Sequence, residues 1–401
     1  MVGLSTAWFL QEHGVEVTVI DRQRVAAGAS LGNAGWLTPG IATPLPEPAV
    51  LNYGIRAVFS PNSPVYVPPS ANRDFLRFVT GFMRHSTMKA WKKAMSSLVP
   101  INDLSLPAFE TLTSNGVHGQ VLEAEPFTAA YENTEDRTTL LEEIQHIHAS
   151  GGDISFDVID GDRARELVPA LSERIACAII LHGQKFIHPG DFVTALAESV
   201  EARGGRIIVG KAVRALRDMG RSVLVETDAA TAEQFDQVVI ASGAWLPLLA
   251  RQHGVKHVVQ AGRGYSFSVA MEQVPHAPVY FPTARVALTP LGDRLRVAGM
   301  MEFRRPEEAL DPRRIEAIVE SARPLLRGAD LDNRQEEWVG SRPCTVDGLP
   351  LIGGTRTPRV FVAGGHGMWG ITLGPITGKL LAEQMVTGQR PRELAPFDPL
   401  R

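Results

Sequence analysis

Asp21 closes a short apolar segment, EVTVID, and follows Gly3 by 18 residues. A carboxylate at the end of the second strand of a dinucleotide-binding unit accepts hydrogen bonds from a ribose hydroxyl. The same carboxylate would repel a ribose 2′-phosphate, so Asp21 disfavours NADP. The alternative is an aspartate that caps a turn. The helical and strand patterns before Asp21 favour ribose binding.

Gly3 fits the third position of the dinucleotide fingerprint G-x-G-x-x-G, where a helix packs closely on a strand. The first two glycines, and the strand that carries them, would precede Met1. We therefore expect an apolar strand and a glycine pair about 10 to 15 residues upstream of Met1, the length of one strand and a turn. Sequencing the 5′ region of the gene tests this expectation.

Two further segments are rich in small residues. ASLGNAGWLTPG (29–40) contains Ser30, Asn33, Ala34 and Gly35, whose backbone could approach a planar ligand and donate to phosphates. An ordinary flexible loop is the alternative. The other segment, GGHGMWG (364–370), follows a strand and leads into a helix. The N-terminus of a helix suits negative charge, such as that of a reduced flavin.

Three side chains could meet a substrate. Arg342 carries a planar fork of N–H donors that suits a carboxylate, and a surface salt bridge is the alternative. Tyr265 and Tyr280 could line a pocket or donate to that carboxylate, or each could be a core tyrosine. The only cysteines, Cys177 and Cys344, lie far apart without metal-ligand spacing, so we expect no metal site and no disulfide.

The elements that must position these residues follow from the hydrophobic pattern. Helices are expected at 2–14, 189–205 and 374–388, and strands at 16–21, 206–210, 222–227, 237–243 and 359–365. This alternation predicts an α/β, Rossmann-like domain built from separate stretches of chain. Strands at 264–270, 278–283, 285–291 and 295–301 predict an antiparallel sheet in a second, α+β domain, followed by a helix at 311–326.

The region between these parts has its own character. Dense prolines from Pro39 to Pro69 predict an extended crossing between domains. Helices at about 73–95, at about 100–115 and through LLEEIQHIHASGG predict an α-rich insertion. The basic, aromatic stretch 73–93 is amphipathic, and packing against its own protein is favoured over peripheral membrane binding.

Composition excludes several classes of protein. The 401 residues include 44% hydrophobic and 21% charged residues, and the net charge is -4, which argues against a nucleic-acid partner. The sequence has no run of 18 apolar residues and no secretory signal pattern. We expect a cytoplasmic location, with peripheral contact at the inner face of the membrane left open.

The chain resembles the D-amino acid oxidase superfamily of FAD-dependent oxidoreductases, most closely bacterial D-amino acid dehydrogenases and glycine oxidase. The matching segments occur in the family's order: VGLSTAWFLQEHGVEVTVID, SLGNAG, HPGDFVTALAESVEARGG, VVIASGAW, GSRPCTVDGLPLIG and AGGHGMWGITLGPITGKLLAEQM. They span nearly the whole chain. The resemblance implies a discontinuous FAD-binding domain (1–50, 183–246 and 335–401) and a substrate domain (51–182 and 247–334).

The resemblance also implies roles for individual residues. Arg342 would hold the substrate carboxylate, and Asp21 and Arg22 would meet the adenosine. The remaining cofactor residues would be Ser30, Asn33, Ala34, Gly35, Val213, Gly243, Gly365, His366, Gly367, Gly370, Ile371 and Thr372.

The reaction that the resemblance implies is oxidative deamination of a small amino acid, of the D configuration, through hydride transfer from Cα to flavin N5. Oxygen or a quinone would accept the electrons. Two alternatives stay open: secondary amine oxidation similar to that of sarcosine oxidase, and a subunit that binds no cofactor.

Overall fold

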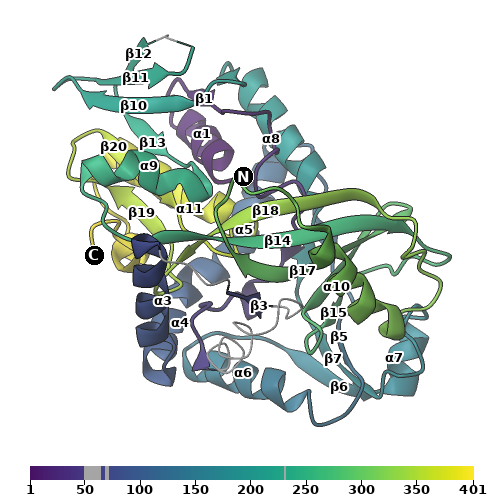
Figure 1. The fold of residues 1–401 in the computed structure, drawn as a ribbon. Coiled ribbons are helices and arrows are strands. Elements are labelled where there is room, and N and C mark those ends of the chain that lie inside the picture. The colour runs from purple at the N-terminus through teal and green to yellow at the C-terminus, as the bar shows by residue number, and fades with distance from the viewer. Residues whose placement is uncertain (49–64, 68–71, 230–231) are drawn as a thin grey trace.

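The computed structural model describes residues 1–48, 65–67, 72–229 and 232–401 (Figure 1). Within this part of the chain the strands form five sheets, of which the largest has nine strands. The proline-rich crossing expected between Pro39 and Pro69 lies largely outside the described residues. The helices and strands together form the mixed α/β fold that the sequence predicts.

Parallel strands and their helices form the part of the fold expected to hold a dinucleotide. In chain order they are α1 (Val2–Glu12), β1 (Thr18–Ile20), α8 (Pro189–Ala202), β9 (Arg206–Ile208), β13 (Val238–Ile240), β20 (Val360–Gly364) and α11 (Gly374–Thr387). β1 pairs in parallel with β9, β13 pairs in parallel with β20, and β19 (Leu351–Gly354) lies antiparallel on β20. These strands form two separate sheets among the described residues. The strand expected before Met1 stays a prediction.

Helices α1 and α11 pack side by side, one near each end of the chain (Figure 1). Small residues allow this contact, because a Cβ on Gly378 would lie 2.6 Å from the backbone of Ser5. On the strand side of α1, a Cβ on Gly3 would lie 3.3 Å from Cβ of Ala241, just after β13. Gly3 therefore lies close to the end of β13, and its place in the dinucleotide fingerprint stays a prediction.

The nine-stranded sheet forms the second layer (Figure 1). Its strand order is β18 (Gln335–Thr345), β14 (Val259–Ala270), β17 (Arg294–Phe303), β16 (Val286–Leu291), β15 (Val279–Phe281), β5 (Phe127–Tyr131), β7 (Cys177–Leu181) and β6 (Phe156–Asp160), with β3 (Val65–Tyr66) beside β17. The four predicted strands are present and neighbours among them are antiparallel. The strand that carries Arg342, β18, pairs with β14 in this sheet. The proposed domain boundaries stay a prediction.

Helix α10 (Pro312–Ala322) covers one face of the nine-stranded sheet. Its Ile315 and Ile318 share a hydrophobic cluster with Phe267 of β14 and Val297 of β17. Asp311 caps the helix by accepting from the backbone N–H of Arg313, as its position before Pro312 predicts. The apolar side of α10 therefore packs on the central strands of the sheet.

The prediction of an α-rich insertion is wrong in part, because the same region also contributes β5, β6 and β7 to the nine-stranded sheet. The residues of β5 (FTAAY) and β7 (CAIIL) are buried throughout. A strand that is covered on both faces is largely apolar along its whole length, so it lacks the alternation by which strands are recognised.

The predicted helix boundaries in this insertion also need correction. The helices are α3 (Arg73–His85), α4 (Met88–Asp103), α5 (Ser105–Ser114), α6 (Thr138–Ala149) and the short α7 (Gly161–Leu167). The helix expected at 73–95 is divided because Thr87 Oγ1 accepts from the N–H of Ala90 and begins a new helix. Pro100, expected to begin a helix, lies inside α4.

The apolar face of α3 packs on its own protein, as the favoured interpretation predicts. Phe75, Phe78 and Phe82 form a cluster with Phe303 and Cys344. None of the described helices is both long and apolar enough to cross a membrane.

The remaining elements are short. They are β2 (Trp36–Leu37), β4 (Leu122–Glu123) and β8 (Lys185–Phe186) in one sheet, β10 (Val213–Asp218), β11 (Val223–Thr227) and β12 (Ala232–Phe235) in another, and α9 (Leu246–Ala250). Single 3₁₀ turns are η1 (Pro39–Ile41), η2 (Gly243–Trp245), η3 (Arg251–His253) and η4 (Arg323–Leu325), and a longer one is η5 (Arg392–Phe397).

Candidate active site

The loop from Ser30 to Gly35 is held in one conformation by the nine-stranded sheet. Three of its carbonyl oxygens accept from sheet side chains: Leu31 from Arg296 (2.7 Å), Gly32 from Ser266 (2.8 Å) and Ala34 from Thr289 (2.6 Å). Within the loop, Asn33 Oδ1 accepts from the N–H of Gly35 at 2.7 Å. Gly35 has φ 78° and contacts Ile187 O, so a side chain would not fit there. These contacts disfavour an ordinary flexible loop.

Asp21, Arg22, Val213 and Gly243 come together where β1, β9 and β13 end. The carbonyl of Asp21 accepts from the N–H of Lys211 at 3.0 Å, and Val213 packs in the same cluster as Ile20. Asp21 Oδ1 accepts from the N–H of Gln23 at 2.8 Å, so the carboxylate does cap a turn. An ionised carboxylate has about four acceptor sites, so this bond leaves capacity for a ribose hydroxyl.

Arg22 lies over the ring of Trp245, with its guanidinium carbon 3.5 Å from the ring centroid. Trp245 belongs to η2, which begins at Gly243. The stacked pair joins the end of β1 to the segment after β13. Sequence analysis did not single out Trp245, although it ends the quoted motif VVIASGAW.

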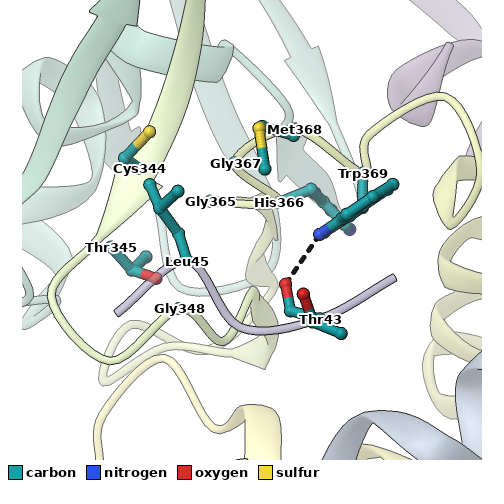
Figure 2. A pocket seen from close by; sticks show the side chains of 10 residues that line it. All are labelled: Thr43, Leu45, Cys344, Thr345, Gly348, Gly365, His366, Gly367, Met368 and Trp369. Carbon is teal, nitrogen blue, oxygen red and sulfur yellow. Dashed lines mark hydrogen bonds between the residues drawn. The ribbon is translucent and has the colours of Figure 1, made fainter. Parts of the chain in front are cut away.

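The glycine turn after β20 lies against the end of β18 (Figure 2). The N–H of Gly367 donates to the carbonyl of Pro343 at 2.9 Å. Gly365 has φ 78°, and a Cβ there would lie 2.9 Å from Cγ2 of Thr345. Trp369 Nε1 donates to the carbonyl of Thr43 at 2.7 Å, which fixes the far side of the turn.

Some side chains of this turn contact the protein interior, and others contact the loop after β1. His366 Nε2 and Thr377 Oγ1 of α11 are 2.9 Å apart, and burial lowers the pKa of His366 to about 4. His366 is therefore neutral near pH 7. Ile371 packs in the hydrophobic cluster of α1, and Thr372 Oγ1 donates to the carbonyl of Trp36 at 3.0 Å. A Cβ on Gly370 would have no neighbour closer than 3.6 Å, so close packing does not require a glycine at this position.

Two helix N-termini lie beside each other near this turn. Neither α1 nor α11 has a side chain that caps its first N–H groups. A Cβ on Gly374 of α11 would lie 2.5 Å from Cγ of Met1, which precedes α1. Unpartnered N–H groups at helix starts attract anions.

A small cavity of about 10 Å³, room for about one water molecule, lies between the glycine turn and the end of β18 (Figure 2). It is lined by Thr43, Leu45, Cys344, Thr345, Gly348, Gly365, His366, Gly367, Met368 and Trp369. Burial raises the pKa of the Cys344 thiol to about 12, so this side chain is an uncharged thiol at neutral pH. Thr43 was not among the residues predicted from the sequence, and it lies in none of the segments that match the family.

Arg342 lies on the same face of β18 as Cys344. Its Nη1 donates to the carbonyl of Met300 at 2.8 Å, and its guanidinium lies against Gly264, leaving no room for a Cβ there. Burial lowers the pKa of Arg342, although the guanidinium stays charged at neutral pH. Among the described residues no carboxylate lies within ion-pairing distance of it. A surface salt bridge, the alternative for this residue, is not what the structure shows.

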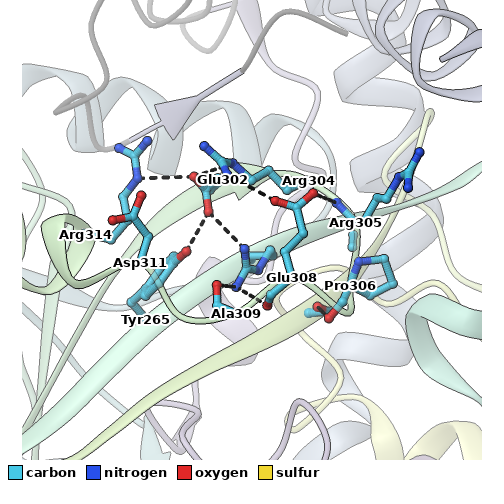
Figure 3. A network of polar contacts seen from close by, with 12 residues as sticks. Tyr265, Glu302, Arg304, Arg305, Pro306, Glu308, Ala309, Asp311 and Arg314 are labelled. Carbon is cyan, nitrogen blue, oxygen red and sulfur yellow. Dashed lines mark hydrogen bonds and ion pairs between the residues drawn. The ribbon is translucent and has the colours of Figure 1, made fainter. Parts of the chain in front are cut away.

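Tyr265 faces the side of the nine-stranded sheet away from Arg342, because Arg342 pairs with Gly262 and Tyr265 lies three residues further along β14. Figure 3 shows the polar contacts that Tyr265 makes on that side. Its hydroxyl donates to Glu302 Oε2 at 2.6 Å, and both side chains are about 1% exposed. Glu302 also pairs with Arg263 (3.4 Å), Arg304 (2.9 Å) and Arg314 (3.3 Å). The structure therefore does not bring Tyr265 together with Arg342. Sequence analysis missed this network, although a glutamate directly after the apolar run LRVAGMM signals a buried charge.

Tyr280 lies near the loop that follows Asp21. Its ring meets that of Trp36 edge-on, with centroids 5.4 Å apart. Trp36 also donates through Nε1 to Thr289 Oγ1 at 2.9 Å. Tyr280 therefore lies close to the loop, whereas no described contact joins it to Arg342.

Comparison with known proteins agrees with this geometry. Residues 1–384 match the family described as DAO: FAD dependent oxidoreductase. A D-amino acid dehydrogenase of Cereibacter sphaeroides is 30% identical over 399 residues, covering 98% of this chain and 91% of that protein. The corresponding protein of Agrobacterium fabrum is 29% identical, covering 98% and 94%.

Solved structures share the fold. Glycine oxidase from Geobacillus kaustophilus superposes with a TM-score of 0.74 at 21% identity, covering all of this chain and 96% of the other. Glycine oxidase from Bacillus cereus gives a TM-score of 0.73 at 22% identity, covering 99% and 95%. The chain belongs to the DAO family of FAD-dependent oxidoreductases.

Proposed function

We propose that this protein oxidises the carbon–nitrogen bond of a small amino acid, of the D configuration, with FAD as the cofactor. Arg342 carries the proposal, because its partly buried guanidinium has no carboxylate partner among the described residues and shares a strand face with Cys344 at the cavity. A buried cation without a counterion is costly, and a substrate carboxylate would supply one. The D configuration follows the relatives named D-amino acid dehydrogenase.

The residues present fit FAD. Asp21, Arg22, Val213 and Gly243 would surround the adenosine, and the uncapped start of α1 with Gly3 would face the pyrophosphate. The loop of Ser30, Asn33, Ala34 and Gly35 would meet the phosphates and the isoalloxazine. The turn residues Gly365, His366, Gly367, Gly370, Ile371 and Thr372 would surround its pyrimidine end, beside the uncapped start of α11. Bound FAD would supply the acceptor for a hydride from the substrate Cα.

Arg342 would orient the substrate. Its carbonyl partner Met300 holds Nη1, and Gly264 lets the guanidinium lie flat against β14. The remaining N–H groups of a fixed guanidinium can bind both oxygens of a carboxylate in one plane. Binding in this way restricts rotation of the substrate about its Cα, so the Cα–H bond points in one direction.

The side chains near the turn keep the site free of competing charge. His366 is neutral because burial lowers its pKa to about 4, and Cys344 keeps its proton because burial raises its pKa to about 12. Neither therefore attracts the ammonium nor binds the carboxylate of a substrate.

Absorption spectroscopy of the purified protein gives the first test. We expect flavin bands that survive gel filtration, and a colourless folded protein would contradict the cofactor assignment. Mixing under anaerobic conditions with D- and L-alanine, glycine, sarcosine and proline then identifies the substrate from bleaching of those bands. D-Alanine should bleach them faster than L-alanine. Faster bleaching by sarcosine than by any primary amine would instead support secondary amine oxidation.

The electron acceptor is tested with the same substrate. Reoxidation by oxygen alone defines an oxidase, whereas reoxidation only by a quinone or an artificial acceptor defines a dehydrogenase. We propose a dehydrogenase, in keeping with the names of the relatives. Hydrogen peroxide formed in amounts equal to the product would contradict this.

A further inference from the structure

Trp338 lies next to Arg342 on one face of β18. The two residues are four positions apart and point to the same side of the strand, with Gly340 between them on that face. On the neighbouring strand β14, Gly264 is paired directly with Gly340. The surface between Trp338 and Arg342 is therefore made by two glycines, which have no side chains.

Both side chains extend over this pair of glycines. A Cβ on Gly340 would lie 1.9 Å from Cη2 of Trp338, and a Cβ on Gly264 would lie 2.3 Å from Cζ of Arg342. The Cβ positions of directly opposite residues in an antiparallel pair are about 4.5–5.5 Å apart. One end of the indole and the guanidinium are therefore neighbours above the two glycines.

The opposite end of the indole contacts the loop after β1. A Cβ on Gly32 would lie 2.2 Å from both Cδ2 and Cε3 of Trp338. The carbonyl of Gly32 accepts a hydrogen bond from Ser266, the residue of β14 that is paired with Trp338. Trp338 thus lies between the guanidinium of Arg342 and the loop that would meet the isoalloxazine.

Close contacts at both ends restrict the indole. A side chain at Gly32 or at Gly340 would overlap the ring, so both positions require glycine. Trp338 is nevertheless only partly buried, and Arg342 is partly buried as well. An aromatic ring that is held by close packing and still partly exposed forms a rigid apolar wall beside the guanidinium.

A substrate bound to Arg342 would meet this wall. The carboxylate of an amino acid is attached directly to Cα, and hydride transfer requires Cα to lie over the flavin. The guanidinium and the loop that would meet the flavin both lie beside Trp338, so the groups attached to Cα come within reach of the ring. We infer that Trp338 is a specificity-determining residue, which contacts the side chain of the amino acid and restricts its size. This inference rests on the proposed function.

Substrates of increasing size test the inference. Anaerobic reduction of the bound flavin by D-alanine, D-valine and D-phenylalanine gives a second-order rate constant for each compound. The ratio of the D-phenylalanine constant to the D-alanine constant should rise at least about tenfold in Trp338→Ala, because a single methylene group in an apolar pocket changes such a ratio by about 10–200-fold. An unchanged or lower ratio would overturn the inference, since a purely structural tryptophan would slow both substrates alike.

A smaller change keeps the test valid if Trp338→Ala does not fold. Trp338→Phe retains an aromatic ring of smaller area, so the ratio should rise by about threefold or more. The control is Trp91→Phe, the same replacement in the hydrophobic cluster of Met95, Val99 and Ile147. This control should leave the ratio unchanged. An equal rise in both variants would refute the assignment, because it would show a general effect of tryptophan loss.

Arg342→Ala separates failure of this inference from failure of the proposed function. Slower reduction by D-alanine in Arg342→Ala supports the carboxylate site whatever Trp338 does. An unchanged size ratio in Trp338→Ala would then refute the role of Trp338 alone. If none of the three amino acids reduces the flavin of the wild-type protein, the proposed function fails and this inference fails with it.

Discussion

The guanidinium of Arg342 lies directly against the backbone of Gly264 on the neighbouring strand, in the space that a Cβ would occupy. The two strands are antiparallel, with Gly262 paired to Arg342 and Gly264 paired to Gly340. Gly264 therefore leaves room for the guanidinium of Arg342, and the hydrogen bond to the Met300 carbonyl fixes the orientation of the guanidinium. A charged side chain held in this way is ready to bind without rearrangement.

Arg342→Lys and Arg342→Ala should separate charge from geometry. Lysine keeps the charge but not the planar fork, so it should recover only part of the binding that alanine loses. We expect KM for the amino acid to rise roughly 30-fold or more in Arg342→Ala, the value of charged hydrogen bonds. Steady-state kinetics measure this, with flavin absorption as the control for folding. An unchanged KM would exclude Arg342 as the carboxylate site.

Gly264→Ala should displace the guanidinium without removing it. The methyl group would overlap Arg342, so KM should rise while the flavin content stays the same. A double-mutant cycle with Arg342→Ala provides the control. Because both changes act on one contact, the double variant should be no worse than Arg342→Ala alone. Additive effects would mean that Gly264 acts by another route.

Tyr265→Phe should affect stability more than catalysis. The hydroxyl donates to the buried Glu302, and its loss should lower the free energy of unfolding by about 1.5–3 kcal/mol, as for a bond to a charged group. KM for the substrate should stay within about twofold of the wild-type value, because the ring faces away from Arg342. Urea denaturation and kinetics on the same preparation decide the point. A large rise in KM with normal stability would restore the substrate role that the sequence suggests for Tyr265.

His366 should make the protein less stable in mild acid. Burial lowers its pKa from 6.5 to about 4. Between these two pH values His366 therefore binds a proton in the unfolded chain but not in the folded protein. The stabilising contribution is complete above pH 6.5 and declines as the pH falls from there towards about 4, by at most about 1.4 kcal/mol per pH unit. Urea denaturation at several pH values measures the slope. His366→Gln, which cannot titrate, should show a shallower decline, and equal slopes would rule out this contribution.

Much of the chain could be predicted from local patterns. The apolar spacing of α1, α8, α10 and α11 shows which residues face the interior, and Asp311 with Pro312 marks the start of α10. The glycine-rich segments around Gly35 and Gly367 likewise indicate close approach of the backbone, because residue type limits conformation at those positions.

Other features depended on contacts between distant residues. Strands β5 and β7 have no alternation because the structure covers both faces. Tyr265 and Arg342 both looked suited to a carboxylate, yet the pairing of β14 with β18 and β17 places them on opposite faces of one sheet. A shift of one residue in that pairing would exchange the faces, and nothing near either residue in the sequence encodes the register.

The sequence by itself determined most of the helices, the four predicted strands of the large sheet, the glycine turns and the family, because these depend on residue type and short spacing. Only the tertiary structure decided that Arg342 lies against Gly264 with no carboxylate partner among the described residues, and that Tyr265 belongs to a buried charge network. Each of these depends on burial and on partners far along the chain, which local sequence does not specify.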